Sequence, residues 1–227
     1  LSYHSLSGET AALSHISFHL MPEEFLAVVR PSGCGKSTLL NLICGLLHAE
    51  SGTILMNGKP LNKDSARIGY MLQKDHLLEW RSIYRNVLLG LEIQGELTKD
   101  NLSYVDEMLK LYELDKFRDS RPSQLSGGMR QRAALIRTLV LKPDLLLLDE
   151  PFSALDYQTR LNVSDDIGKI LKKQRKPAIL VTHDISEAIS MADRVLILSK
   201  RPATVIKIVP IDLDMKDRTP LSSRNAP

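Results

Sequence analysis

FLAVVRPSGCGKST, residues 25–38, is the stretch that constrains the fold most strongly. It begins with five apolar residues, continues through a glycine-containing loop and ends in Lys36, Ser37 and Thr38. The apolar residues 25–29 predict a buried β-strand. A helix is predicted over residues 36–47, where apolar side chains recur at helical spacing: Leu39, Leu42, Ile43 and Leu46.

This order of strand, glycine-rich loop, Lys-Ser and helix is the arrangement of a P-loop. In a P-loop, backbone N–H groups and the helix N-terminus attract phosphate oxygens. We expect Lys36 to contact the β- and γ-phosphates of a nucleotide, Ser37 to bind Mg²⁺ and Thr38 to contact the α-phosphate. By itself, the string also fits a glycine-rich turn that only begins a helix. The remaining phosphate contacts would come from the loop backbone at Ser32, Gly33, Cys34 and Gly35.

Arg30 occupies the position at which the motif G-x-x-x-x-G-K-[ST] has its first glycine. Glycine tolerates positive φ, whereas arginine in the left-handed region costs about 1–2 kcal/mol. Pro31 favours extended backbone at the residue before it. An extended Arg30 would leave the loop able to bind a nucleotide, and a left-handed Arg30 would strain the loop and lower its affinity. We favour the extended form, because the inner residues of the loop are intact.

Beyond the loop, short apolar runs alternate with longer helical patterns, which predicts an α/β fold. Residues 76–130 have a helical pattern in which Thr98 is a candidate N-cap. The apolar face of that pattern includes Leu102, Val105, Leu109 and Tyr112. Asn57-Gly58 predicts a hairpin turn. We therefore expect an α/β core interrupted by a helical insert, with further strands over residues 53–56, 67–72, 145–148, 178–182 and 195–198.

Length, composition and charge are those of an ordinary globular protein. The 227 residues suffice for one large or two small domains, and 43% of them are hydrophobic, as in ordinary globular proteins. A net charge of +3 gives no indication of nucleic-acid binding. Cys34 and Cys44 provide no disulfide framework, which favours a reducing compartment. Apolar runs are too short for a membrane span and no secretory signal is expected, so any role at a membrane would be played from the cytoplasmic side through other chains.

LLLLDE, residues 145–150, is an apolar strand that ends in two acids. Neighbouring strand residues point to opposite faces, so Asp149 and Glu150 are expected to have different roles. We expect Asp149 to hold Mg²⁺ through water, and Glu150 to orient and deprotonate an attacking water. Without a P-loop upstream, an ordinary strand end capped by acids would explain the pair equally well.

LSGGMRQR, residues 125–132, is the most specific string in the chain. It resembles the signature motif of ABC transporter ATPases, and residues 1–205 follow the order of that family's motifs. Gln73 resembles the glutamine of the Q-loop, SALD at 153–156 resembles the D-loop, and His183 resembles the switch histidine. Tyr3 is the candidate for the aromatic residue that stacks on adenine.

The resemblance implies the ABC ATPase fold, a P-loop NTPase core with an antiparallel β subdomain and a helical insert. Residues 1–75 and 131–205 would form the α/β core with the β subdomain. Residues 76–130 would form the helical lobe with the signature motif, and residues 206–227 a C-terminal tail. The family usually has Gly-Glu where this chain has Glu23-Glu24, in a turn where we expect the change to affect stability more than chemistry.

The resemblance also implies catalytic roles. Gln73 would sense Mg²⁺ and the attacking water, and His183 would contact the γ-phosphate and support Glu150. Asp156 would couple two ATP sites across a dimer. Taken alone, Gln73 is also explained as a surface amide and His183 as a satisfied polar residue.

A homodimer is implied by the signature motif. Ser126, Gly127 and Gly128 open a helix, whose N-terminus attracts anions. In the family, that site closes on ATP bound by the other subunit of a head-to-tail dimer.

EWRSIYRN, residues 79–86, is similar to the importer ATPases of the nitrate, sulfonate and taurine group. In that group, residues 73–86 would meet integral membrane permease subunits at the cytoplasmic face, and a solute-binding protein would act indirectly. A partly exposed Trp80 suits such a contact. The solute is open and includes sulfonates, taurine, nitrate and thiamine precursors. Alternatively, the apolar side chains here fill the helical lobe: Leu77, Leu78, Trp80 and Tyr84.

Two other classes of function are alternatives to a transport ATPase. One is an ABC protein that acts outside transport, although this chain has neither a second such domain nor a long coiled-coil insert. The other is a nucleotide-binding regulatory subunit whose hydrolysis is weakened by Arg30.

Overall fold

The computed structural model describes residues 2–5, 8–29, 38–61 and 66–212. Its centre is a six-stranded sheet in the order β10-β9-β3-β8-β7-β6. Five strands run parallel, and β10 pairs antiparallel with β9 at one edge. The strands are β3 (Phe25–Val29), β6 (Ile68–Met71), β7 (Leu145–Asp149), β8 (Ala178–Thr182), β9 (Arg194–Leu198) and β10 (Val205–Pro210).

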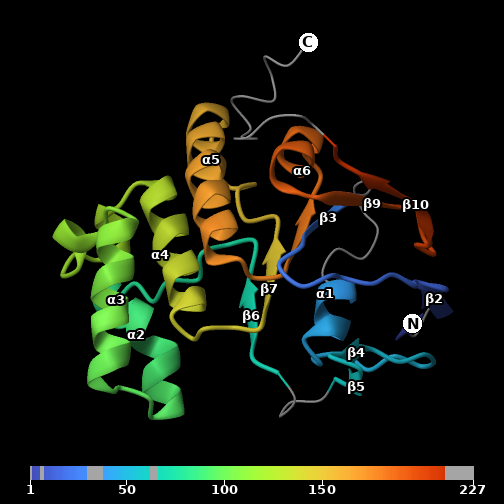
Figure 1. Cartoon of the computed structure of the whole chain (residues 1–227), viewed down its shortest axis with the longest axis horizontal. Helices are drawn as coiled ribbons and strands as arrows, with labels where there is room; N and C mark the ends of the chain where they lie inside the picture. Colours follow the sequence, from blue (N-terminus) through green and yellow to red (C-terminus); the bar gives the residue numbers. More distant parts are fainter. Residues whose placement is uncertain (1, 6–7, 30–37, 62–65, 213–227) are drawn as a thin grey trace.

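Helices flank this sheet and extend to one side of it (Figure 1). Three of them, α2, α3 and α4, group into a lobe beside β6, while α1 lies on the other side of β6 and β7 in this view. The helices are α1 (Thr38–Ile43), α2 (Ile83–Gln94), α3 (Lys99–Leu111), α4 (Gly127–Leu139), α5 (Tyr157–Gln174) and α6 (Ile185–Met191), with short 3-10 turns at Asp115–Phe117 and Pro122–Gln124. None of the described helices is long and apolar enough to cross a membrane.

Both faces of the central strands are buried. Leu145 and Leu147 of β7 pack into a cluster that includes Leu40 of α1, while Leu146 and Leu148 pack into a larger cluster built with the other helices. Strands covered on both faces read as continuous apolar runs, which is why LLLL marks β7 so clearly. The sheet is therefore a rigid base for the residues that follow its strands.

Two further antiparallel pairs lie outside the central sheet: β1 (Ser2–Ser5) with β2 (Gly8–Ala11), and β4 (Leu55–Met56) with β5 (Lys59–Pro60). The predicted turn at Asn57-Gly58 joins β4 and β5, with φ of 52° and 75° at the two residues. Positive φ at both central residues is the requirement that Asn-Gly satisfies best.

Most of the predicted elements are confirmed. Thr98 caps α3, since its Oγ1 accepts a hydrogen bond from the Asn101 backbone N at 3.2 Å. The helix predicted over residues 36–47 ends earlier, at Ile43, because Gly45 takes a φ of 74°. Leu46, which was predicted on the apolar face of that helix, is 70% exposed. The strand expected over 53–56 is confined to Leu55–Met56.

The element boundaries differ from the divisions expected from the sequence. Helix α4 runs through the expected division between residues 130 and 131. Residues 206–210, expected in a tail, belong to β10, which hydrogen-bonds to β9 in the central sheet.

The Glu23-Glu24 turn carries both strain and a compensating ion pair. Glu23 has a φ of 63°, a conformation that costs a residue with a Cβ about 1–2 kcal/mol. Glu24 is buried, and its Oε2 accepts a hydrogen bond from Arg194 Nη2 of β9 at 3.0 Å. Burial favours the protonated Glu24, but the hydrogen bonds from Arg194 and from the Met21 backbone N outweigh it and lower its pKa.

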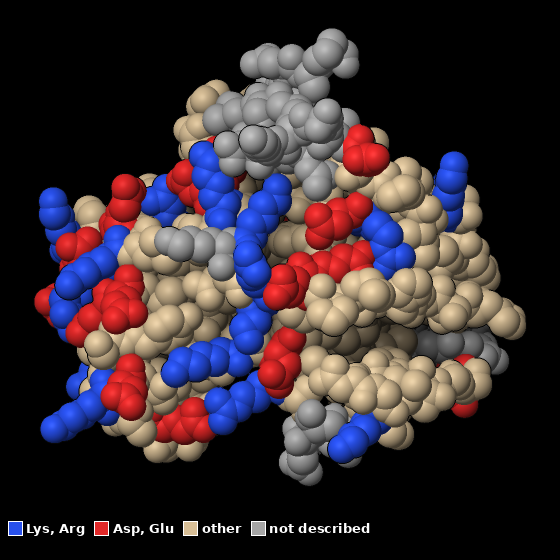
Figure 2. Space-filling view, viewed as in Figure 1, with Lys and Arg blue, Asp and Glu red and all other residues tan. Residues whose placement is uncertain are grey.

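Charged side chains of both signs are interspersed over the helical lobe on the face seen in Figure 2. This distribution agrees with the small net charge of the chain.

Candidate active site

The candidate site lies where the parallel strands end. The register places Val29 opposite Thr182, Asp149 opposite Val181, and Met71 opposite Leu148, so the carboxyl ends of β3, β8, β7 and β6 lie at one edge. Ligands of open α/β sheets bind outside these ends. The residues that follow the strands therefore approach one another although they are far apart in the sequence.

Glu150 follows β7 directly and is held in an unusual conformation. Its φ is 45° and its side chain is 4% exposed. Its backbone N–H donates to Val181 O of β8 at 2.8 Å, and its carbonyl accepts hydrogen bonds from Ser153 N and Oγ at 3.1 and 2.9 Å. Such strain persists only where surrounding contacts fix the backbone, and it is concentrated at functional sites.

Two predicted catalytic residues converge on the Glu150 carboxylate. Gln73 Nε2 lies 3.4 Å from Glu150 Oε2, and His183 Nδ1 lies 3.4 Å from the same oxygen. Gln73 Nε2 also donates to Ser153 Oγ at 3.2 Å. Glu150 is buried, while Gln73 and His183 remain partly open to solvent. One carboxylate oxygen thus meets two groups from different loops at an accessible edge.

Asp149 is buried beside Glu150, at the end of β7, and is 5% exposed. Tyr70 Oη of β6 donates to its Oδ2 at 3.4 Å and lies 3.3 Å from Asn41 Oδ1 of α1. Tyr70 was not predicted from the sequence, because its approach to Asp149 depends on β6 and β7 being neighbours in the sheet. The described residues contain no cluster of three or more His, Cys, Asp or Glu that could hold a metal. A single buried carboxylate suits Mg²⁺, which proteins bind through one or two carboxylates together with substrate phosphates.

The signature residues begin α4 as expected. Ser126 caps the helix, its Oγ accepting a hydrogen bond from Met129 N at 3.3 Å, and Gly127 and Gly128 form the first turn. A Cβ at Gly128 would lie 2.7 Å from Val163 Cγ2 of α5, so close packing also requires this glycine. In Figure 1, α4 and α1 lie on opposite sides of β6 and β7.

Asp156 caps the following helix, α5. Its Oδ1 accepts a hydrogen bond from the Thr159 backbone N at 3.1 Å, and hydrogen bonding from Thr159 lowers its pKa. The exposed carboxylate therefore fixes the end of the SALD segment next to Glu150.

Two arginines of α4 connect the signature helix to the segment after Gln73. Arg130 Nη2 pairs with Asp75 Oδ2 at 2.9 Å. Arg137 donates to the carbonyls of Asp75 and His76 at 2.6 and 2.8 Å, and burial lowers the pKa of its guanidinium. Sequence reasoning missed these contacts, because they join residues more than fifty positions apart.

The segment expected to meet a membrane partner divides into two parts. Leu77 and Ile83 are buried in the lobe, and Tyr84 is half-buried beneath the guanidinium of Arg118, 4.2 Å from the ring centroid. Trp80, in contrast, is 72% exposed. Trp80 is therefore available for a contact, while its neighbours stabilise the lobe.

Several predicted residues lie outside the described part of the chain. They include Arg30 and the loop residues through Ser37, so their predicted roles remain predictions. Tyr3 belongs to β1, and its side chain is not described either. Thr38 is the first residue of α1 and is buried.

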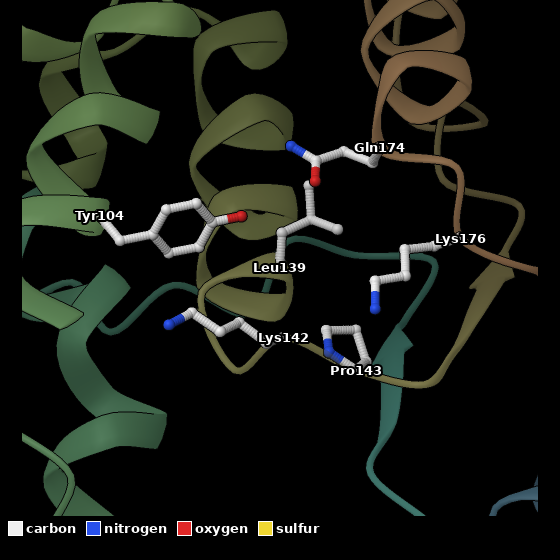
Figure 3. Close-up of a pocket in the computed structure, with 6 residues that line it drawn as sticks. All are labelled: Tyr104, Leu139, Lys142, Pro143, Gln174 and Lys176. Atoms are coloured by element: carbon white, nitrogen blue, oxygen red, sulfur yellow. The ribbon is translucent and has the colours of Figure 1, made fainter. Parts of the chain in front are cut away.

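A cavity of about 280 Å³ lies between α3, α4 and α5 (Figure 3). It contains none of the predicted catalytic residues, and the Lys142 ammonium within it already lies 3.1 Å from Asn101 Oδ1 and 5.2 Å from the Tyr104 ring centroid. We place the active site at the strand ends. The cavity is lined by Tyr104, Leu139, Lys142, Pro143, Gln174 and Lys176.

Comparison with known proteins agrees with this geometry. A family model described as ABC transporter matches residues 13–153. The chain is 44% identical over 226 residues to YtlC of Bacillus subtilis, an uncharacterized ABC transporter ATP-binding protein, covering 100% of this chain and 87% of that protein. It is 40% identical over 201 residues to the taurine import ATP-binding protein TauB of Rhizobium johnstonii, covering 88% of this chain and 77% of that protein.

A solved structure is also similar. It is a dimeric ATP-binding cassette in a post-hydrolysis state with ADP and Pi, and it matches with a TM-score of 0.77 and 28% identity over 93% of this chain and 96% of that one. The chain accordingly belongs to the ABC transporter family, as an ATP-binding subunit with ATPase activity.

Proposed function

We propose that this chain hydrolyses ATP to drive a membrane importer of a small sulfonate, and that Glu150, Gln73 and His183 form its hydrolytic site. The convergence of Gln73 and His183 on one oxygen of the buried Glu150 carboxylate supports the hydrolytic site most directly. The similarity to the taurine import ATP-binding protein TauB supports the solute class.

Glu150 is the general base in this proposal. A carboxylate within hydrogen-bonding reach of the attacking water orients it and accepts its proton. The Gln73 amide positions that water from the neighbouring strand end, and the His183 imidazole contacts the γ-phosphate from the other side. The fixed backbone at Glu150, anchored to Val181, keeps the carboxylate at the edge where the phosphate would lie.

Asp149, together with Gln73 and the Ser37 hydroxyl, would hold Mg²⁺. Bound Mg²⁺ neutralises phosphate charge during phosphoryl transfer. Lys36, Thr38 and the backbone of residues 32–35 would bind the phosphates, and Tyr3 would stack on the adenine.

A head-to-tail homodimer completes the proposed site. Ser126, Gly127 and Gly128 at the N-terminus of α4 would bind the γ-phosphate of ATP held by the other subunit, and Asp156 would link the two sites. The dimeric cassette to which this chain is similar supports the formation of a dimer. At the cytoplasmic face of the membrane, residues 73–86 would contact the permease subunits, and a solute-binding protein would deliver the solute.

The dimer is tested with Glu150→Gln, which keeps the shape of the side chain but removes the base. We expect this variant to bind ATP and elute as a dimer from a sizing column with ATP and Mg²⁺, while the wild type hydrolyses ATP and elutes mainly as a monomer. Glu113→Gln is the matched control, because its carboxylate is 82% exposed on the lobe. A Glu150→Gln protein that stays monomeric with ATP contradicts the proposal.

The solute is tested by deleting the gene from its source organism. We expect the deletion strain to lose growth on taurine as the sole sulfur source and to retain growth on sulfate. Growth restored by the wild-type gene, but not by the Glu150→Gln gene, would tie uptake to hydrolysis. Unchanged growth on taurine and on alkanesulfonates, with a defect on nitrate or thiamine precursors, would redirect the solute assignment.

A further inference from the structure

Behind His183 lies a small buried polar group that the hydrolytic site described above does not use. Thr182, the last residue of β8, and Glu187, in the first turn of α6, are 2% and 5% exposed. Thr182 Oγ1 donates a hydrogen bond to Glu187 Oε2 at 2.7 Å. The Asp184 backbone N donates to Thr182 Oγ1 at 3.0 Å. Of the two neighbours of His183 in the chain, Thr182 is therefore bonded to the buried carboxyl group directly, and Asp184 is bonded to the Thr182 hydroxyl.

Helix α6 holds the other end of this short loop. Asp184 Oδ1 accepts hydrogen bonds from Ser186 N at 2.8 Å and Glu187 N at 3.2 Å, which caps the helix. The loop from Thr182 to Asp184 thus joins β8 to α6 through side-chain bonds at both of its ends. His183 projects from the middle of the loop and reaches Glu150 Oε2 with Nδ1 at 3.4 Å.

The buried carboxyl group of Glu187 does not by itself favour the stability of the fold. Burying a carboxylate costs free energy unless it is paired, and an apolar residue at the junction of β8 and α6 would avoid that cost. Within the part of the chain that the structure describes, the Thr182 hydroxyl is the single hydrogen-bond partner of this carboxyl group. The position is better explained by what the carboxyl group does for the loop than by the stability of the core.

We propose that Glu187 is a positioning residue of the hydrolytic site: through Thr182 its carboxyl group fixes the loop that carries His183, and so sets the place of the imidazole relative to Glu150. This inference rests on the proposed roles of His183 and Glu150. Glu187 itself does not touch the nucleotide.

The electrostatic surroundings connect Glu187 to the same site. The pKa of Glu187 is raised to about 7, and burial is the largest cause. The hydrogen bond from Thr182 lowers this pKa, and the neighbouring charges change it in opposite directions. Asp184 and Glu150 raise the pKa, and Arg160 of α5 lowers it. Since the charge on Glu150 favours a proton on Glu187, loss of that charge during proton transfer would favour ionised Glu187 and strengthen its hydrogen bond to Thr182.

The experiment compares three variants by steady-state ATPase kinetics. Glu187→Leu removes the acceptor for Thr182, and we expect kcat to fall at least tenfold with KM for ATP within about twofold of the wild type. Glu187→Gln retains an acceptor, and we expect kcat within about threefold. Ser186→Ala is the control on the same helical turn: its side chain is exposed and only its backbone N–H caps the helix, so kcat should be unchanged.

A double-mutant cycle with His183→Ala separates positioning from general stability. We expect Glu187→Leu to lower kcat less than twofold further in the His183→Ala background, because the group that it positions is gone. A full tenfold loss in both backgrounds, or an unchanged kcat in Glu187→Leu, overturns the inference. If the single variant His183→Ala keeps the wild-type kcat, the proposed role of His183 is wrong, and this inference fails with it. If His183→Ala loses activity but Glu187→Leu does not, only this inference fails.

Thr182→Val tests the same hydrogen bond from the other side, should Glu187→Leu fail to fold. The valine is close in shape to threonine and cannot donate to Glu187. We expect a loss of kcat similar to that of Glu187→Leu, again without a change in KM. A Thr182→Val protein that folds and retains wild-type kcat overturns the inference.

Discussion

Glu187 also makes the stability of the folded protein depend on pH. Its pKa is raised from an ordinary 4.5 to about 7, mainly by burial, so the folded protein binds this proton more tightly than the unfolded chain. The free energy of unfolding therefore falls as pH rises from about 4.5 to 7, and the whole decrease is reached above pH 7. At about 1.4 kcal/mol for each tenfold difference in proton affinity between the folded and unfolded chain, that decrease is about 3 kcal/mol at most.

Glu187→Gln removes this titration and keeps the acceptor for Thr182. We expect its melting temperature to be close to that of the wild type at pH 5 and about 5 °C higher at pH 8, measured by circular dichroism. Ser186→Ala serves again as the control and should follow the wild type at both values. A difference between Glu187→Gln and the wild type that does not change with pH would show that Glu187 does not titrate in this range.

Arg30 is the residue whose effect on the phosphate loop the sequence leaves open. Because Pro31 favours extended backbone at the residue before it, we expect Arg30 to cause little strain. Arg30→Gly should then leave KM for ATP and kcat within about threefold of the wild type in a coupled ATPase assay. A tenfold or larger gain on introducing glycine would favour a strained loop and a regulatory subunit with weakened hydrolysis.

At the scale of elements, the contact between α4 and the segment after Gln73 is fixed by charged groups. Arg137 donates to two backbone carbonyls, those of Asp75 and His76. His76 has a φ of 46°, so the segment needs support to keep its course. Through this contact, a movement of the signature helix would carry the Gln73 segment with it.

Arg137→Ala leaves both carbonyls without their donor. Hydrogen bonds to charged groups contribute about 1.5–3 kcal/mol each, so we expect the loss of two to lower the free energy of unfolding by about 3–6 kcal/mol, measured with urea. Arg85→Ala on α2 is the matched control: its side chain is 63% exposed and its ion pair with Glu92 should contribute less than about 1 kcal/mol. Equal losses in the two variants would mean that the contact of α4 with residues 75 and 76 has no special role.

At the scale of the whole molecule, Trp80 is the side chain that we expect to contact the permease. It is 72% exposed, next to neighbours buried in the helical lobe. Trp80→Ala should leave the fold and the ATPase activity of the isolated protein unchanged. We expect it to reduce binding to inverted membrane vesicles of the source organism at least tenfold, since exposed aromatic side chains are common centres of binding energy.

Ile206→Ala is the control for this measurement. Ile206 is a similarly exposed apolar residue, 63% exposed on the edge strand β10, away from residues 73–86. Its variant should bind the vesicles as the wild type does. Equal effects of the two substitutions, or no effect of either, would place the membrane partner elsewhere.

The sequence by itself determined the local elements and the chemistry of single positions. Residues 178–182 form the predicted strand, Thr98 caps the predicted helix, and Asn57-Gly58 makes the predicted turn. These features depend on apolar periodicity and on bonds between residues a few positions apart, which a sequence displays directly. The family motifs likewise predict the site residues, because the order of these motifs along the chain is specific.

Only the tertiary structure decided how these parts meet. Gln73 and Glu150 are 77 positions apart and approach because β6 and β7 are neighbours in the sheet. The same holds for the Arg137 contacts, for the pairing of β10 with β9, and for the exposure of Trp80 beside buried neighbours. Strand order and side-chain burial result from packing over the whole chain, and no local pattern encodes them.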